Sequence, residues 1–143
     1  MSVRRSIRKG FALVEILIVV VILGILAAIV VPQFASASND AKSGNMLSQV
    51  QTLENQFELW RARHGTYPDL ATDGWGDKET PGTMIGDGYI KSAPVNPLTG
   101  GSDPADDWGY DRTDGTLTPA LGDYDDEYNW DPDKGLVKDD GGE

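Results

Sequence analysis

The stretch RKGFALVEILIVVVILGILAAIVVPQF, residues 8–34, determines how the rest of the chain is organised. From Phe11 to Val31 it has 21 residues and one charged side chain, that of Glu15. An α-helix of this length rises about 30 Å, which matches the hydrocarbon thickness of a membrane. A helix also satisfies its own backbone hydrogen bonds there. We therefore expect residues 11–31 to form a transmembrane helix, with the basic residues before it on the cytoplasmic side.

A second helical pattern follows the apolar run. Between residues 32 and 64, apolar side chains recur at spacings of three and four and predict a single buried stripe: Met46, Leu47, Val50, Leu53, Phe57 and Trp60. Gly65 follows the pattern and suits the left-handed conformation that ends a helix. We expect residues 32–64 to be the amphipathic half of the same helix, with Pro32 and Gly44 as its weaker points.

The residues after the helix are rich in Gly, Pro, Asp and Thr and predict a small head, residues 65–122. Residues 108–111 and 116–118 flank a turn at Asp114-Gly115 and predict a short antiparallel β-hairpin. Apolar residues at 84–85 and 89–90 are expected to anchor a loop on the helix. Residues 123–143 form an acidic C-terminal segment with little to bury. The expected fold class is α+β: a long N-terminal helix and a small C-terminal head containing a short hairpin and loops.

The composition excludes several classes of function. The chain has 23 Asp and Glu against 12 Lys and Arg, so direct nucleic-acid binding is not expected. Without any cysteine, it has neither disulfides nor a thiolate metal site. No nucleophile motif, phosphate-binding loop or pair of histidines is present, so the chain is not expected to be an enzyme. The single histidine, His64, is interpreted as a helix-capping or surface group.

Several export or anchoring signals compete to explain residues 1–37. Ala35-Ser-Ala37 resembles a signal-peptidase site, which would release a secreted binding module that begins at Ser38. The adjacent Arg4 and Arg5 allow a twin-arginine signal, and a plain membrane anchor explains the length of the apolar run. None of these alternatives accounts for Glu15, because an ionised group costs about 3 kcal/mol at the centre of a membrane.

Lys9-Gly-Phe-Ala-Leu-Val-Glu15 resembles the class III signal of type IV prepilins and type II secretion pseudopilins. The resemblance implies that residues 1–10 are a leader, which a prepilin peptidase removes between Gly10 and Phe11. It further implies that Phe11 is N-methylated and that the subunit polymerises into a helical filament. Loss of the leader would change the formal net charge from −11 to −15. The implied location is the bacterial inner membrane, with a single span and the head on the periplasmic side.

The resemblance implies a partner for Glu15, namely the N-terminal amine of Phe11 on a neighbouring subunit. This amine has an intrinsic pKa of about 8 and is mostly cationic at neutral pH. A carboxylate about 4 Å away would gain up to about 4 kcal/mol, which offsets the cost of burial. The alternative is that Glu15 only satisfies the amino end of its own helix. Pairing between subunits would fix their register, which apolar contacts alone leave open.

Two points stay open from the sequence. The lack of cysteine and the segment Ala93-Pro-Val-Asn-Pro-Leu98 favour a type II secretion pseudopilin, which works with secretion machinery and minor pseudopilins. The alternative is a type IV pilus subunit for adhesion, motility or DNA uptake. The acidic segment also allows two interpretations, a solvated tail or a calcium site, with these candidate ligands: Asp123, Asp125, Asp126 and Asp131.

Overall fold

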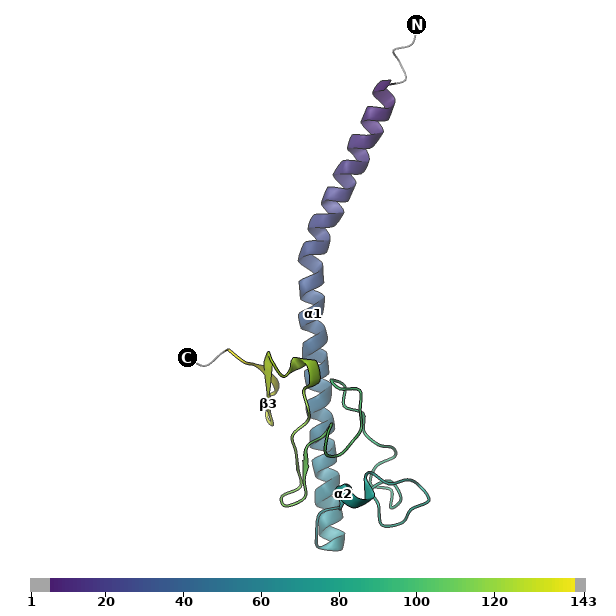
Figure 1. Ribbon diagram of the computed structural model, residues 1–143, viewed down its shortest axis with the longest axis vertical. Coiled ribbons are helices and arrows are strands. Elements are labelled where there is room, and N and C mark those ends of the chain that lie inside the picture. The colour runs from purple at the N-terminus through teal and green to yellow at the C-terminus, as the bar shows by residue number, and fades with distance from the viewer. Residues whose placement is uncertain (1–5, 141–143) are drawn as a thin grey trace. The chain divides into compact units, whose positions relative to one another are not determined.

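The computed structural model describes residues 6–140, with side chains from residue 11 onward except that of Ala35. The Arg4-Arg5 pair lies outside the described residues. The chain divides into two units, an N-terminal unit, Met1–Asn39, and a C-terminal unit, Asp40–Glu143. Figure 1 shows the long helix of the chain and the loops and short strands that follow it.

The first element is a single long helix, α1 (Ser6–His64), which includes all described residues before Gly65. The helix continues without interruption through Pro32 and Gly44. It ends as expected at Gly65, which has φ +80° and donates its backbone N–H to the carbonyl oxygen of Arg61 at 2.8 Å. Arg61, Arg63 and His64 lie in the last turn, where positive charge favours the helix dipole.

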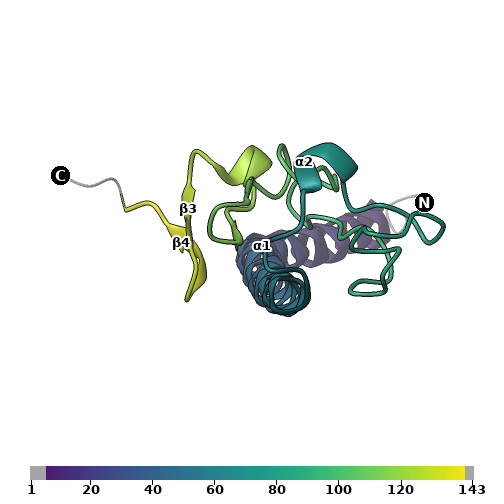
Figure 2. The same cartoon turned by 90° about the horizontal axis from the view of Figure 1, so that it is seen from below.

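The predicted apolar stripe is the core of the C-terminal unit. Five of its six members are buried, with exposed fractions of 7% or less: Met46, Val50, Leu53, Phe57 and Trp60. Leu47 is half-buried. Loops and strands cover this face, and the opposite side of the helix stays open in the view along its axis (Figure 2). The spacing of three and four therefore identified the buried face correctly.

Loops rather than regular elements form most of that cover. The short helix α2 (Leu70–Asp73) begins after Asp69, whose carboxylate accepts the N–H of Thr72 at 3.3 Å. Met84 is fully buried, and the Tyr89 ring lies 5.0 Å from that of Trp60, so the predicted loop anchor is confirmed. Trp75 and Trp108 add their rings to the same core. The buried rings of this core therefore come from α1 and from the loops that pack on it, and the rings of Tyr110 and Trp130 pack against them from the strands.

The side chain of Asn96 holds three loop segments together. It is fully buried and its amide donates to the carbonyl oxygens of Asp107 at 2.7 Å and Ala120 at 2.9 Å. Its side-chain oxygen accepts the N–H groups of Leu98 and Thr99. All four hydrogen bonds of the amide group are thus made inside the protein, which removes the cost of burying it.

The predicted hairpin is present, with β1 (Tyr110–Asp111) antiparallel to β2 (Thr116–Leu117) and Tyr110 opposite Leu117. A 3₁₀ turn, η1 (Gly122–Tyr124), follows it. The structure then contains a second hairpin that the sequence analysis did not predict, β3 (Tyr128–Asp131) paired with β4 (Gly135–Lys138).

The second hairpin lies against α1. The N–H of Leu136 donates to Ser43 Oγ at 2.8 Å, and Lys42 donates to the Tyr124 hydroxyl at 2.9 Å. A Cβ atom on Gly135 would lie only 2.5 Å from Ser43 Oγ, so only glycine allows this approach. Residues 128–138 of the acidic C-terminal segment therefore form a hairpin that is docked on the helix.

Candidate functional site

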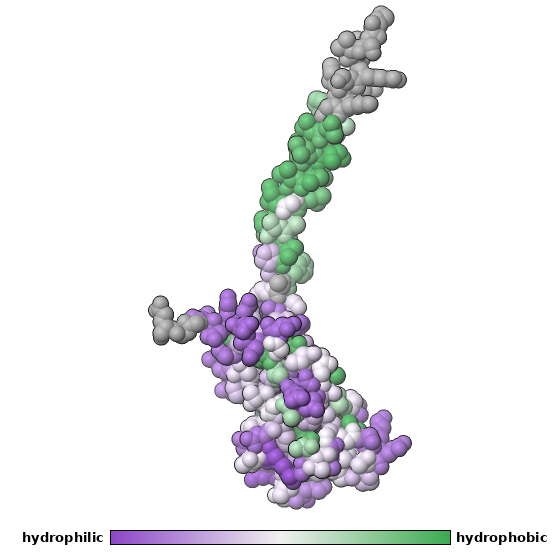
Figure 3. Space-filling model, viewed as in Figure 1, coloured by the Kyte–Doolittle hydropathy of each residue, from purple (hydrophilic) through white to green (hydrophobic). Residues whose placement is uncertain are grey.

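The most distinctive surface of the N-terminal unit is its apolar helix. The apolar side chains from Phe11 to Phe34 are exposed, by 78% at Phe11 and 42% at Val30. The most apolar window of this helix has a mean hydropathy of 3.3 and buries none of its residues, and it is long enough to cross a membrane. In Figure 3 this part of the helix is mostly green, with a few pale patches. Such a surface needs lipid or other helices around it.

Glu15 and Phe11 lie one helical turn apart in this segment. Both side chains are exposed, and residues spaced by four share a face of an α-helix. The bond between Gly10 and Phe11 lies within α1, which begins at Ser6. In this form of the chain the N–H groups after Phe11 therefore have carbonyl partners one turn earlier. If the chain is cut after Gly10, those N–H groups lose these partners and a new amine appears beside Glu15.

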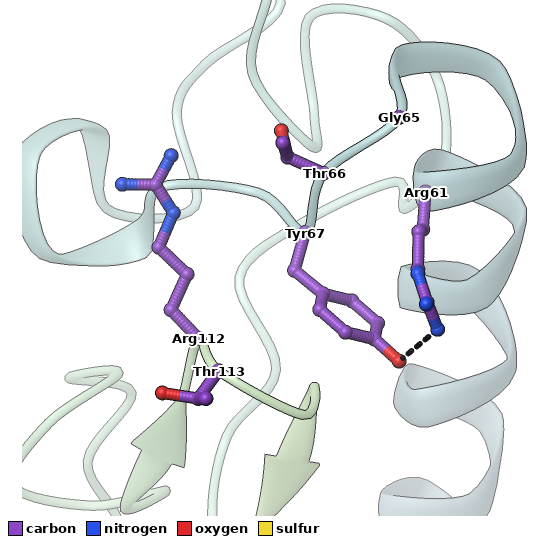
Figure 4. A pocket seen from close by; sticks show the side chains of 6 residues that line it. All are labelled: Arg61, Gly65, Thr66, Tyr67, Arg112 and Thr113. Carbon is purple, nitrogen blue, oxygen red and sulfur yellow. Dashed lines mark hydrogen bonds between the residues drawn. The ribbon is translucent and has the colours of Figure 1, made fainter.

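The C-terminal unit has a pocket of about 440 Å³ at the end of α1, which no pattern in the sequence predicts. It is lined by side chains from the helix end and from the turn after β1: Arg61, Gly65, Thr66, Tyr67, Arg112 and Thr113 (Figure 4). The two arginines lie far apart in sequence, so no local motif connects them. Only the docking of the first hairpin against the helix end brings them to one pocket.

Hydrogen bonds hold the helix side of this pocket. Arg61 Nη1 donates to the Tyr67 hydroxyl at 3.1 Å, and its guanidinium lies 5.0 Å from the centre of the Tyr67 ring. The Tyr67 hydroxyl in turn donates to the Glu58 carboxylate. This bond to Glu58 is the main reason why the pKa of Tyr67 is raised above 10.0. The ring and the carboxylate together fix the position of Arg61.

Arg112 forms the other side of the pocket. Its Nη1 donates to Asp69 Oδ2 at 2.7 Å, and just over half of its side chain is exposed. Two residues earlier in the chain, the Tyr110 hydroxyl donates to the carbonyl oxygen of Pro68 at 2.9 Å. Burial raises the pKa of Tyr110 well above the ordinary value of 10.0. The segment before α2 is thereby attached to the first hairpin.

The structure distributes the four calcium candidates over two places. Asp123, Asp125 and Asp126 lie in and directly after η1, whereas Asp131 ends β3. Asp131 accepts the N–H groups of Asp133 and Lys134, so it stabilises the hairpin turn. Within residues 6–140, no three His, Asp or Glu side chains gather in a way that could hold a metal ion. Calcium binding by these four aspartates therefore stays a prediction.

His64 has a structural environment. Its ring stacks on Trp60 at 4.1 Å, and its Nδ1 lies 3.1 Å from the carbonyl oxygen of Trp60. Its Nε2 lies 4.0 Å from the Asp87 carboxylate. These contacts place His64 at the end of the helix, in agreement with a capping or surface role.

Comparison with known proteins identifies the family. The prokaryotic N-terminal methylation motif matches residues 5–31. The chain is 35% identical over 101 residues to the type II secretion system core protein G of Pseudomonas aeruginosa, covering 66% of this chain and 70% of that protein. The protein of the same name from Escherichia coli is 29% identical over 134 residues, covering 86% and 91%. The one from Vibrio cholerae is 34% identical over 100 residues, covering 65% and 68%. No solved structure shows significant similarity to the chain.

A methylation motif on an exposed apolar helix, followed by a small α+β unit, defines a pilin-like protein. The chain belongs to the family of type II secretion system core protein G, the major pseudopilins. Members of this family are structural and not catalytic. The sequence-based assignment to the pseudopilins is confirmed, and the chain is assigned to type II secretion rather than to a surface pilus.

Proposed function

We propose that the chain is made as a membrane-bound precursor and cut between Gly10 and Phe11 by a prepilin peptidase. The new amine of Phe11 is methylated, and the mature subunit polymerises into the pseudopilus of a type II secretion system. Its C-terminal unit lies on the periplasmic side of the inner membrane. The observation that carries this proposal is the exposed apolar surface from Phe11 to Phe34, in which Glu15 is the one acidic residue.

The position of Glu15 supports assembly through the new amine. In the membrane, the carboxylate of a single subunit lies one turn from its own N-terminus. In a filament, a neighbour that is shifted along the axis presents a second amine. Opposite charges attract each other more strongly in a low-dielectric core, and an unpaired charge there is costly. Only alignments of neighbouring helices that pair Glu15 with the Phe11 amine therefore avoid a buried unpaired charge. The N-terminal helices thus form the core of the filament.

The partners follow from this cycle. The precursor needs the prepilin peptidase, the mature subunit needs other copies of itself, and the assembly machinery and minor pseudopilins start the filament. The surface of the C-terminal unit contributes contacts between subunits but performs no chemistry.

Mass spectrometry of the mature chain tests the proposal. We expect a chain that begins with N-methylated Phe11. A Gly10→Ile variant is the control and should keep its leader, because the enlarged side chain blocks the peptidase. A mature chain that begins at Ser38 would overturn the proposal in favour of a secreted module. Deletion of the gene should abolish type II secretion and leave surface pili unchanged.

A further inference from the structure

The charges of the C-terminal unit are strongly unbalanced. Residues 40–143 contain 22 Asp and Glu and eight Lys and Arg. Two copies of such a surface repel each other over most of their area. Close packing of these units in a filament therefore requires a place where opposite charges meet.

The pocket at the end of α1 supplies the positive side of such a contact. Two guanidinium groups, those of Arg61 and Arg112, line it together with the hydroxyl groups of Thr66 and Thr113 (Figure 4). Each guanidinium has five N–H donors. Within the described part of the chain, only the Nη1 atom of each arginine has a polar partner. Arg61 Nη1 contacts Tyr67 and Glu58, and Arg112 Nη1 contacts Asp69. The remaining donors suit a carboxylate, which arginine binds through two parallel hydrogen bonds.

The turn around η1 supplies the negative side. Four exposed carboxylates occur within five residues: Asp123, Asp125, Asp126 and Glu127. Among residues 6–140, no side chain donates a hydrogen bond to these carboxylates or forms an ion pair with them. Other aspartates of the unit differ, since Asp77, Asp103 and Asp114 accept hydrogen bonds that stabilise their own turns. The acidic turn thus carries charge that the fold itself does not use.

The two sites lie at opposite ends of the C-terminal unit. The acidic turn is attached to α1 at Lys42 and the pocket begins at Arg61. At 1.5 Å per residue these positions are about 28 Å apart along the helix. In Figure 1 the second hairpin and α2 lie beside correspondingly separate parts of the helix. A chain therefore cannot place its own acidic turn in its own pocket.

We propose that the Arg61–Arg112 pocket of one subunit binds the acidic turn, residues 123–127, of a second copy. This contact rests on the proposed function, because it joins subunits of the same filament. It is heterologous, with different surfaces on the two sides, so a pair of subunits still has one free pocket, on one subunit, and one free turn, on the other. In a helical filament such a contact repeats from one subunit to the next and does not stop at a dimer.

Engineered cysteines test the contact in the full-length chain. The protein has no cysteine of its own, so every disulfide comes from the introduced residues. Thr113→Cys lies in the pocket, and Asp126→Cys lies in the turn and leaves three carboxylates. A disulfide needs Cα atoms within about 7 Å. The helix positions beside the two sites, Lys42 and Arg61, are about 28 Å apart, so no bond within one chain is expected.

Filaments of the double variant, oxidised in the presence of EDTA, should give a ladder of dimers, trimers and larger products. Thr113→Cys combined with Lys78→Cys is the matched control and should give no ladder, because Lys78 is exposed in a loop outside the pocket. A product that stops at the dimer, or crosslinks that require added Ca²⁺, would overturn the proposal.

A charge exchange tests the chemistry of the contact. Arg112→Glu should lower the yield of the ladder about fivefold, and the additional change Asp125→Arg should restore most of it. Arg63→Gln is the control and should have no effect, because Arg63 does not line the pocket. Since Arg112 also pairs with Asp69, thermal unfolding must show that each variant is folded. Processed chains that form filaments without a ladder would refute this contact and leave the proposed function intact, whereas unprocessed chains without filaments would refute the function itself.

Discussion

The side-chain amide of Asn96 donates a hydrogen bond to the carbonyl oxygen of Ala120 at 2.9 Å, across 24 positions of sequence. The same amide group binds Asp107, Leu98 and Thr99, so one buried side chain fixes the loops that cover the helix. These loops have no sheet to support them between α2 and β1. Their positions therefore depend on a few side chains with fully satisfied hydrogen bonds.

Asn96→Ala should lower the free energy of unfolding by about 2–4 kcal/mol, because two buried carbonyl oxygens and two N–H groups lose their partner. Thermal or urea unfolding of the full chain in detergent, followed by tryptophan fluorescence, measures the change. Asn129→Ala is the control, since Asn129 is exposed on β3, and should change the stability by less than about 0.5 kcal/mol. Equal effects of the two substitutions would show that Asn96 does not have the role assigned to it.

Phe57→Ala should destabilise the C-terminal unit by about 3–5 kcal/mol. Phe57 is fully buried, and its ring lies 4.9 Å from that of Tyr110 and 6.3 Å from that of Trp75. Leu59→Ala provides the matched control on the open side of the same helix, where Leu59 is 43% exposed, and should cost less than about 1 kcal/mol. Unfolding in urea should separate the two variants clearly. A similar cost at both positions would contradict the assignment of the buried face.

Tyr110→Phe should change how stability depends on pH. The pKa of Tyr110 is raised in the folded state, so its stabilising contribution is complete below the ordinary value of 10.0 and is lost as the pH rises above it. The wild type should be more stable than the variant at neutral pH by about 1 kcal/mol, because it keeps the bond to Pro68.

Above pH 10 this advantage should shrink by up to about 1.4 kcal/mol per pH unit. Denaturant unfolding at pH 8, 9, 10 and 11 measures the difference, and comparing the two chains removes the contribution of lysine titration. A difference that stays constant from pH 8 to 11 would argue against the burial of this hydroxyl.

Glu15→Val should leave cleavage after Gly10 intact and abolish filaments, because the neighbour's Phe11 amine loses its partner while the helix becomes more apolar. Sedimentation of sheared filaments and mass spectrometry of the membrane fraction measure the two steps separately. Ile16→Val is the control and should assemble normally. Normal filaments from Glu15→Val would refute the pairing.

The sequence predicted those parts of the fold that depend on local patterns. Period and composition identified α1, its buried stripe and its end at Gly65, and the turn at Asp114-Gly115 identified the first hairpin. The second hairpin was not predicted, because the acidic composition of residues 123–143 was interpreted as a tail and the turn-forming residues within it were not recognised as a hairpin turn. Asp131-Pro-Asp-Lys-Gly135 has proline and glycine where a tight turn needs them, and Asp131 caps it.

The pocket could not be predicted, because it depends on contacts between distant segments. Arg61 and Arg112 line one pocket, where Tyr67 and Asp69 hold their guanidinium groups, and neither arginine belongs to a motif. The burial of Asn96 could not be predicted either, because the local sequence around a buried loop asparagine does not differ from that around an exposed one. In contrast, Gly10, Phe11 and Glu15 lie close together in the sequence, so the resemblance of residues 9–15 to a prepilin signal is enough to predict their roles, which stay predictions.

The arrangement around Asn96 has a consequence for where the protein can mature. Hydrogen bonds from amide and carboxylate groups hold the covering loops in place, and no disulfide contributes because the chain has no cysteine. Folding therefore consumes no oxidant and requires no thiol-exchange catalyst. The shape of the C-terminal unit should be the same under reducing and oxidising conditions, on whichever side of the membrane it is formed.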